Sequence, residues 1–268
     1  MANKFLGWKS GLVYKTFYLF GIAVFKKLRT PYSIARELET LRNTYLAAQA
    51  AHPKVFDKYK SIHKNQDVVI VATGPTLNSY VPIAGAIHIG VNRAILEDRI
   101  EFDYHMCIDY PFMDESALVN YRPGACHKLY GLHTNPMVKS ISESLLEKCK
   151  AERFYIHVVH PEKHEKRFPL DLAHQPLMVY ASVVSCAFQF ALWCNPQRIY
   201  LVGCDTSNNG YFTKDNNRVK QGLSVNMLLY EWQQLAKFAK DFYPDVEIIS
   251  INPVGLKGLF KDEYTDNI

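Results

Sequence analysis

The sequence lacks the motifs that mark several common classes of enzyme. It contains no GxxxxGK(S/T) motif, which excludes a P-loop nucleotide hydrolase, and no GxGxxG fingerprint, which counts against a dinucleotide-dependent oxidoreductase. Its six cysteines include no CxxC pair, so neither a zinc site nor a disulfide framework is expected, and a reducing cytoplasm suits the chain best. The length of 268 residues, 48% of them hydrophobic, suits one large α/β domain with a helical preface.

Acidic residues are absent from the first 29 residues, which carry six lysines and arginines. Because the net charge of the whole chain is +5, the remainder sums to −1, and a nucleic-acid-binding domain is not expected. The apolar run at residues 16–25 has about half the length that a membrane-spanning helix needs. Lys26 and Lys27 follow it without a small-residue cleavage site, which argues against a secretory signal peptide.

Bulky aromatic residues stand beside these positive charges. They predict a basic, aromatic, amphipathic segment over residues 1–30 that contacts the inner membrane at its surface. The alternative is a helix that packs on the domain, or on a second copy of itself in a homo-oligomer.

Residues 68–77 carry the most informative local pattern of the predicted domain. Five apolar residues run into a Thr-Gly-Pro-Thr turn, which predicts a buried parallel strand followed by a helix start. Gly74 lets the backbone approach a ligand, and Pro75 suits the first position of a helix. The hydroxyls of Thr73 and Thr76, with free N–H groups at a helix start, predict a phosphate site. An ordinary strand-to-helix turn is the alternative.

Short apolar runs alternate with amphipathic stretches along the rest of the chain, which predicts a mainly parallel, doubly wound, Rossmann-like α/β sheet. The further expected strands are 86–91, 104–108, 128–132, 154–159, 199–202 and 246–251. The expected helices are 76–80, 93–98, 139–150, 181–193 and 224–242. The domain organisation is then the basic segment 1–30, a helical connector over 31–65 that Pro53 breaks into two pieces, and an α/β domain over 66–268.

Ligands of open parallel sheets bind beyond the carboxyl ends of the strands, and polar residues follow four of the expected strands. Besides the Thr-Gly-Pro-Thr turn, these are Asn92, Asp109 and the run from Asp205 to Tyr211. Asn92 suits contact with a base or ribose, or caps the helix that follows. Asp109 and Asp205 suit a ribose hydroxyl or a divalent ion, or cap neighbouring helices. The acidic cluster of Asp109 with Asp114 and Glu115 has no diagnostic metal-binding spacing.

Three blocks of the sequence resemble a known family. Residues 68–77 resemble the VIIAGNGPSL opening of the bacterial sialyltransferases of glycosyltransferase family 42, and residues 185–193 and 198–205 resemble that family's helix and the strand after it. The opening, with residues 90–94 and 103–109, is also similar to a wider group that includes flagellin nonulosonate glycosyltransferases and an archaeal pterin diphosphokinase. The resemblance covers roughly residues 66–255 and implies a GT-A-like sheet that binds a CMP-activated sugar.

The resemblance also implies roles for matching residues. The glycine-proline turn would hold the donor phosphate, and the residues that end the next strands would contact the nucleotide or the sugar. Ser182 lies near a helix start that contacts the cytidine or a carboxylate, Tyr211 would hydrogen-bond the departing phosphate, and Ser207 stands where the family has a second tyrosine. The donor-binding residues implied are Thr73, Gly74, Pro75, Thr76, Asn92, Asp109, Ser182 and Ser207.

The chain departs from the family where the sialyltransferases carry a histidine general base. No histidine follows His174, and the corresponding loop offers only Lys220 or Asp215. An exposed lysine is protonated, so Lys220 suits stabilisation of the leaving phosphate better than proton abstraction. We expect Tyr211, Lys220 and Asp205 to carry the catalysis, with the general base unidentified.

These observations predict a cytoplasmic, membrane-peripheral glycosyltransferase. It would transfer a CMP-linked, sialic-acid-like sugar with inversion onto a cell-surface glycan, a lipopolysaccharide or another lipid-linked acceptor, with no cofactor, metal ion or nucleic acid. One alternative is a Mg²⁺-dependent diphosphokinase acting on a pterin-like alcohol, with Asp109 holding the metal. The other is a non-catalytic nucleotide-sugar-binding protein, which the missing histidine favours.

Overall fold

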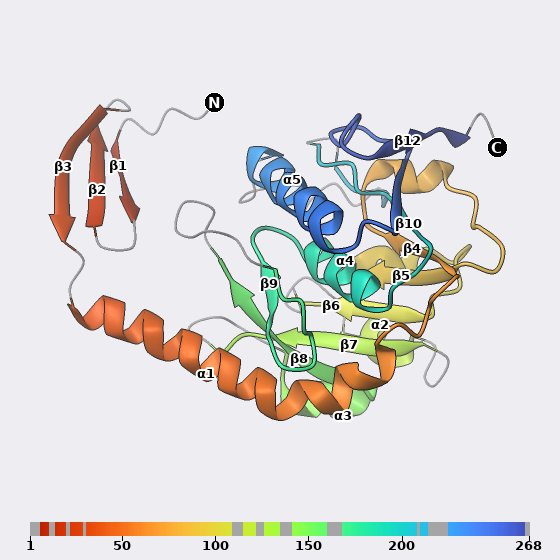
Figure 1. The fold of residues 1–268 in the computed structure, drawn as a ribbon, viewed down its shortest axis with the longest axis horizontal. Coiled ribbons are helices and arrows are strands. Elements are labelled where there is room, and N and C mark those ends of the chain that lie inside the picture. The colour runs from red at the N-terminus through yellow and green to blue at the C-terminus, as the bar shows by residue number, and fades with distance from the viewer. Residues whose placement is uncertain are drawn as a thin grey trace.

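The main body of the protein is a nine-stranded, all-parallel sheet in the order β12-β11-β10-β4-β5-β6-β7-β8-β9 (Figure 1). The computed structural model describes residues 6–10, 14–19, 22–28, 31–108, 115–121, 126–134, 141–159, 168–207, 210–213 and 225–265. The strands of the main sheet are β4 (Asp67–Val71), β5 (Ile87–Val91), β6 (Tyr104–Cys107), β7 (His127–Leu132), β8 (Glu152–Val158), β9 (Leu177–Val179), β10 (Arg198–Val202), β11 (Glu247–Ile251) and β12 (Lys261–Glu263).

Helices cover both faces of this sheet, which confirms the predicted doubly wound α/β class. The α-helices are α1 (Pro31–Phe56), α2 (Glu115–Asn120), α3 (Glu143–Cys149), α4 (Val184–Trp193) and α5 (Val225–Phe242), and the 3₁₀ helices are η1 (Asp57–Tyr59), η2 (Pro75–Ser79) and η3 (Asn92–Leu96). In β4, Ile70 belongs to the same core as Phe56 of α1 and Phe190 of α4, whereas Val71 packs with Leu77 of η2 on the other face. A strand buried on both faces needs a continuous apolar run, which β4 has in the four buried residues after Asp67.

The predicted break of the connector at Pro53 is wrong, because α1 continues through this proline to Phe56. Packing outweighs the lost backbone hydrogen bond. His52, next to the proline, is buried; its Nε2 accepts the N–H of Tyr155 in β8 at 2.7 Å, and its Nδ1 donates to the carbonyls of Leu172 and Gln175 at 2.9 and 3.0 Å. Burial lowers the pKa of His52 to about 4, which keeps the ring neutral, as this donor–acceptor arrangement requires.

Helix α1 runs antiparallel to the strands of the main sheet. Near its carboxyl-terminal end, Lys58 pairs with Glu152 at the start of β8, and further back Thr44 hydrogen-bonds Thr134, just beyond the end of β7. The amino-terminal turns of α1, residues 31–43, therefore extend about 20 Å beyond Thr44, past the carboxyl ends of the strands.

The basic N-terminal segment forms a separate sheet and not the helix considered as the alternative. Strands β1 (Leu6–Ser10), β2 (Tyr14–Leu19) and β3 (Ile22–Leu28) pair antiparallel in that order. Figure 1 shows this sheet at the amino-terminal end of α1, set off from the main sheet. Among the described residues, no helix combines the length and apolar character needed to cross a bilayer.

Three further differences concern short elements. The predicted helices at 76–80 and 93–98 are the 3₁₀ helices η2 and η3, and the helix predicted at 139–150 begins at Glu143, where the Ser142 hydroxyl accepts the N–H of Leu145. Strands β9 and β12, each of three residues, and helix α2 were not predicted. Such short segments carry too few residues to show a period.

Candidate functional site

The strand order reverses at β4. From β4 the chain adds β5 to β9 on one side, then crosses back and places β10 on the other side of β4. In open α/β sheets, this reversal leaves a crevice at the carboxyl ends of the two strands, where ligands bind. Val71 of β4 pairs with Val202 of β10 and with Gly90 of β5, so Thr73, Cys204 and Asn92, each two residues further, lie at the same level. We call this region the β4/β10 crevice.

Thr76 and Asp205 join the ends of β4 and β10 at the β4/β10 crevice. The hydroxyl of Thr76 donates to one carboxylate oxygen of Asp205, and its backbone N–H donates to the other at 3.0 Å. Asp205 is only 6% exposed. Burial raises the pKa of its carboxyl, and the two donors of Thr76 partly offset this rise. Asp205 thus occupies the anion position at the start of η2, where the sequence predicted a phosphate.

Gly74 is required by the packing of this junction. A Cβ at position 74 would lie 2.5 Å from Cγ of Asp205 and 2.5 Å from the carbonyl oxygen of Gly203. The Gly74 N–H donates to that same carbonyl at 2.8 Å, which extends the pairing of β4 with β10 by one bond. The space left by the missing side chain is therefore filled by the protein's own loop after β10.

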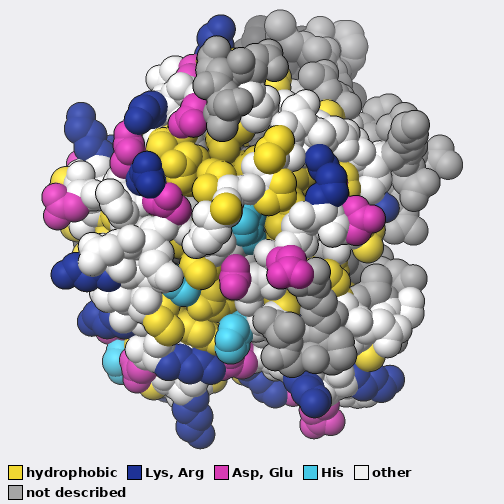
Figure 2. Space-filling view, turned by 90° about the vertical axis from the view of Figure 1, so that its right-hand side faces the viewer, with side chains coloured by type: hydrophobic (Ala, Val, Ile, Leu, Met, Phe, Trp, Pro, Cys, Tyr) yellow, Lys and Arg dark blue, Asp and Glu magenta, His cyan; other side chains and the backbone are white. Residues whose placement is uncertain are grey.

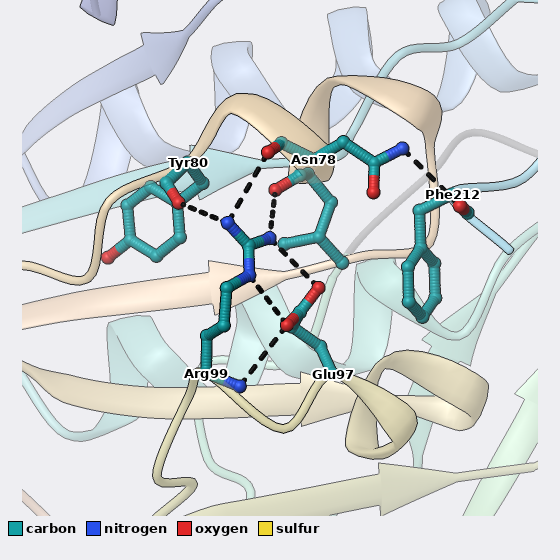
Figure 3. Close-up of polar contacts among 6 residues, drawn as sticks. Asn78, Tyr80, Glu97, Arg99 and Phe212 are labelled. Carbon is teal, nitrogen blue, oxygen red and sulfur yellow. Dashed lines mark hydrogen bonds and ion pairs between the residues drawn. The ribbon is translucent and has the colours of Figure 1, made fainter.

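Arg99 holds the far end of η2 (Figure 3). Its guanidinium donates to the carbonyls of Leu77, Asn78 and Tyr80 at 3.1, 3.3 and 3.2 Å. Its Nε and a terminal nitrogen also pair with the carboxylate of Glu97 at 2.7 and 2.9 Å, and this hydrogen bonding lowers the pKa of that carboxyl. The last carbonyls of a helix have no internal partner, so one arginine here stabilises the end of η2 and the position of the turn before it.

The short segment at residues 210–213 lies against the same turn. The N–H of Phe212 donates to the carbonyl of Thr73 at 2.9 Å, and the side-chain amide of Asn78 donates to the Phe212 carbonyl at 3.3 Å (Figure 3). Tyr211, which precedes Phe212, is 43% exposed. These bonds bring Tyr211 to the β4/β10 crevice, near Thr73, with its side chain accessible to solvent.

Asn92 is fixed at the end of β5 by a buried histidine. Its φ of 47° is left-handed, a conformation that asparagine tolerates better than most residues. The Nε2 of His105 donates to the Asn92 carbonyl at 3.0 Å, and Nδ1 accepts the hydroxyl of Tyr130 at 3.1 Å. Burial lowers the pKa of His105 to about 3, so the ring stays neutral. The capping residue of η3 is Val91, so Asn92 does not serve as the helix cap.

Ser182 lies at the carboxyl edge of the sheet, at the start of α4. The last carbonyls of α4, those of Trp193 and Cys194, accept N–H groups of residues 61 and 63, which precede β4. The opposite end of α4, with Ser182, therefore lies at the carboxyl edge. Helix α4 packs on β4 and β5.

Glu231 of α5 holds the turn that precedes α4. One of its carboxylate oxygens accepts the N–H groups of Tyr180 and Ala181 at 2.8 and 3.3 Å. The side chain is 2% exposed, and burial raises its pKa to about 7 despite hydrogen bonds from Tyr180, Ser185, Ala181 and Ser182. Glu231 therefore positions the backbone beside Ser182.

The structure brings most of the predicted site residues to one edge of the sheet. Those at or beside the β4/β10 crevice are Thr73, Gly74, Pro75, Thr76, Asn92, Asp205, Ser207 and Tyr211, with Ser182 on the same edge. Asp109, Asp114 and Lys220 lie outside the described residues. Within the described ranges, no three histidine, cysteine or acidic side chains are arranged to hold a metal ion.

Sequence reasoning missed the residues that support this site, namely Arg99, His105, Tyr130 and Glu231. A signal existed for Glu231, because it lies on the apolar face of α5, four and seven residues before the buried Leu235 and Phe238. The partners of Arg99 are carbonyls more than 18 residues away, which no local pattern reveals.

Comparisons with known proteins leave the family open. No family model matches the sequence, and no curated protein matches it. One solved structure that matches is the MAf glycosyltransferase from Magnetospirillum magneticum AMB-1, with 13% sequence identity and a TM-score of 0.47. The match covers 88% of this chain but 42% of that protein, so the chain spans less than half of its length. It does not identify the sialyltransferase family, and a similarity this low carries no inference about the reaction.

Proposed function

We propose that the protein is a glycosyltransferase that binds a nucleotide-activated sugar in the β4/β10 crevice. One observation carries the proposal: the glycine turn after β4 and the polar loop after β10 meet at the reversal of strand order, joined by the Thr76–Asp205 hydrogen bonds. The resemblance of residues 68–77 and 198–205 to CMP-sugar-dependent enzymes supports a CMP-linked, sialic-acid-like donor.

The geometry changes the expected division of roles. Both donors of Thr76 are engaged by Asp205, so Thr76 serves to position the turn and not to bind the phosphate directly. The Thr73 hydroxyl, with no hydrogen bond among the described residues, and the exposed phenol of Tyr211 are better placed to donate to the phosphate. Asn92 and Ser182, on neighbouring strand and helix ends, would contact the rest of the nucleotide and the sugar.

The reaction is an inverting displacement. The acceptor hydroxyl oxygen attacks the anomeric carbon, the bond from that carbon to the phosphate oxygen breaks, and CMP departs with the electron pair. Hydrogen bonds from Thr73 and Tyr211 would stabilise the charge that develops on the leaving phosphate. The proton of the acceptor hydroxyl passes to a base outside the described residues, for which Asp215 is the candidate, whereas a protonated Lys220 would stabilise the leaving phosphate.

Release of CMP from CMP-sialic acid, measured in excess EDTA, tests this proposal. We expect turnover without a divalent ion and a fall in kcat of about 10- to 100-fold in Tyr211→Phe, which loses only the donating hydroxyl. Thr73→Val should weaken donor binding, whereas Thr40→Val, the same change on α1, should not. Loss of activity in EDTA and its recovery with Mg²⁺ would contradict the metal-independent mechanism.

A further inference from the structure

The N-terminal sheet has one strongly apolar face. Residues that pair across antiparallel strands lie on the same face of a sheet, and successive residues alternate between faces. The register joins Trp8, Phe17 and Phe25 in one row, and Leu6, Leu19 and Ile22 in the next, all on one face. We call this face, with its six large apolar residues, the aromatic face.

Basic residues end the aromatic face on the side nearest α1. Ser10, Lys15 and Lys27 form the third row, and Lys27 is separated from the start of α1 by three residues. The Leu6 row is the farthest from α1. Two rows are about 7 Å apart along a strand, so the lysines stand about 7 Å from the aromatic row and about 14 Å from the tip row. Apolar rows bordered by lysines on the same face suit a membrane surface, because the apolar side chains can enter among the lipid headgroups while the lysines at the margin pair with lipid phosphates.

We propose that the aromatic face docks on an anionic lipid bilayer. Residues 1–29 carry six positive charges and no acid, which complements the negative surface of a cytoplasmic leaflet. The opposite side of the molecule lacks this charge bias. Figure 2 shows the side turned away from the N-terminal sheet, where positive and negative side chains are intermixed around a central apolar area.

The size of the aromatic face argues against a second copy of the chain as its occupant. Three strands about 5 Å apart, each with about six residues at about 3.3 Å, present an area on the order of 300 Å². A stable protein interface covers about 800 Å² on each partner. Six apolar residues inserted at the level of the lipid headgroups need no such area.

Docking through this sheet would place the membrane on the side of the molecule that carries the candidate site. Because α1 projects past the carboxyl ends of the strands, the N-terminal sheet lies beyond the edge that carries the β4/β10 crevice. Under the proposed glycosyl transfer, this arrangement fits an acceptor carried on a lipid. The lipid-carried acceptor rests on the proposed function, whereas the docking of the aromatic face does not.

Flotation of the full chain with vesicles tests the docking, using phosphatidylcholine alone or with a quarter phosphatidylglycerol. We expect partition at least about tenfold stronger on the anionic vesicles. Lys15→Glu with Lys27→Glu, on the aromatic face, should lower it at least about tenfold. Lys9→Glu with Lys26→Glu, the same change of charge on the other face, should lower it no more than about threefold. Equal loss in the two pairs, or no flotation of the wild type, would overturn the proposal.

Quenching by brominated lipids supplies a second readout that does not depend on charge. Trp193 and Trp232 are buried in the main body, so quenching of tryptophan fluorescence reports on Trp8. Trp8→Phe should abolish the quenching and keep flotation within about twofold. A dimer in light scattering that Trp8→Ser dissociates would show that a second copy covers the face. Nucleotide titration of the same variants separates a failure of docking from a failure of the proposed function.

Discussion

At the scale of single residues, the glycine turn after β4 is shaped by Asp205. A glycine in such a turn is commonly taken to admit a ligand, but here the Asp205 carboxylate and the Gly203 carbonyl occupy the space. The buried carboxylate also takes both donors of Thr76. The turn is therefore held in one conformation before any ligand arrives, which is what a binding site needs.

Gly74→Ala should destabilise the protein by about 2 kcal/mol or more, because the new methyl group overlaps Asp205 and the carbonyl of Gly203, which follows β10. Gly85→Ala is the matched control: its φ of 77° strains an alanine, but nothing lies within 4 Å of the new Cβ, so about 1 kcal/mol is expected. Urea denaturation measures both changes. Equal stability losses would mean that Asp205 does not pack against Gly74 as described.

Glu231 should give the protein a measurable dependence of stability on pH. Its pKa is raised to about 7 from an ordinary value of 4.5, so between these pH values the folded protein holds a proton that the unfolded chain has lost. The free energy of unfolding therefore falls as pH rises through this window, by up to about 3 kcal/mol.

Glu231→Gln should remove that fall, because the amide keeps an oxygen for the N–H groups of Tyr180 and Ala181 and does not ionise. Chemical denaturation at pH 5 and pH 8 compares the two proteins. Glu147→Gln, on the exposed side of α3, should behave like the wild type. If the stability of the wild type depended on pH in the same way as that of Glu231→Gln, the raised pKa of Glu231 would be refuted.

At the scale of elements, η2 depends on a residue outside itself. It has five residues, too short to be stable alone, and Arg99 binds three carbonyls at its end (Figure 3). The sequence predicted that a helical element begins at Pro75, but not that an arginine beyond β5 would secure it.

Arg99→Met should cost about 1–3 kcal/mol of stability and weaken nucleotide binding, since η2 carries the turn of the β4/β10 crevice. Arg153→Met removes a surface arginine whose partner Glu143 is exposed, and should cost less than about 1 kcal/mol. Thermal unfolding and nucleotide titration of both variants test this. An Arg99→Met protein that binds nucleotide as the wild type does would show that the end of η2 is irrelevant to the site.

At the scale of the whole molecule, the sequence was sufficient to predict the seven longer strands of the main sheet and the parallel, doubly wound class of the fold. Local patterns reveal a strand such as β4, because burial on both faces requires an apolar run. They do not reveal strand order. The return of the chain from β9 to β10 beside β4 depends on packing between distant segments, and this return brings the ends of β4 and β10 together at the candidate site.

The N-terminal segment shows the same limit. Its charge and aromatic content were evident from the sequence, but residues 6–28 lack a strict alternation because the register shifts between Phe17 and Tyr18. A bulge of this kind hides the strand pattern and leaves a helix as plausible as a sheet. Only the pairing reveals which residues share the aromatic face.

Calorimetric titration with CMP, UDP, GDP and ATP, each with and without Mg²⁺, tests the central claim most directly. We predict that CMP binds without Mg²⁺, and that Thr73→Val weakens this binding while Thr40→Val leaves it unchanged. Binding of ATP alone, and only with Mg²⁺, would contradict the account in favour of a diphosphokinase. If none of the four nucleotides binds, the β4/β10 crevice is a structural junction and the proposed function is wrong.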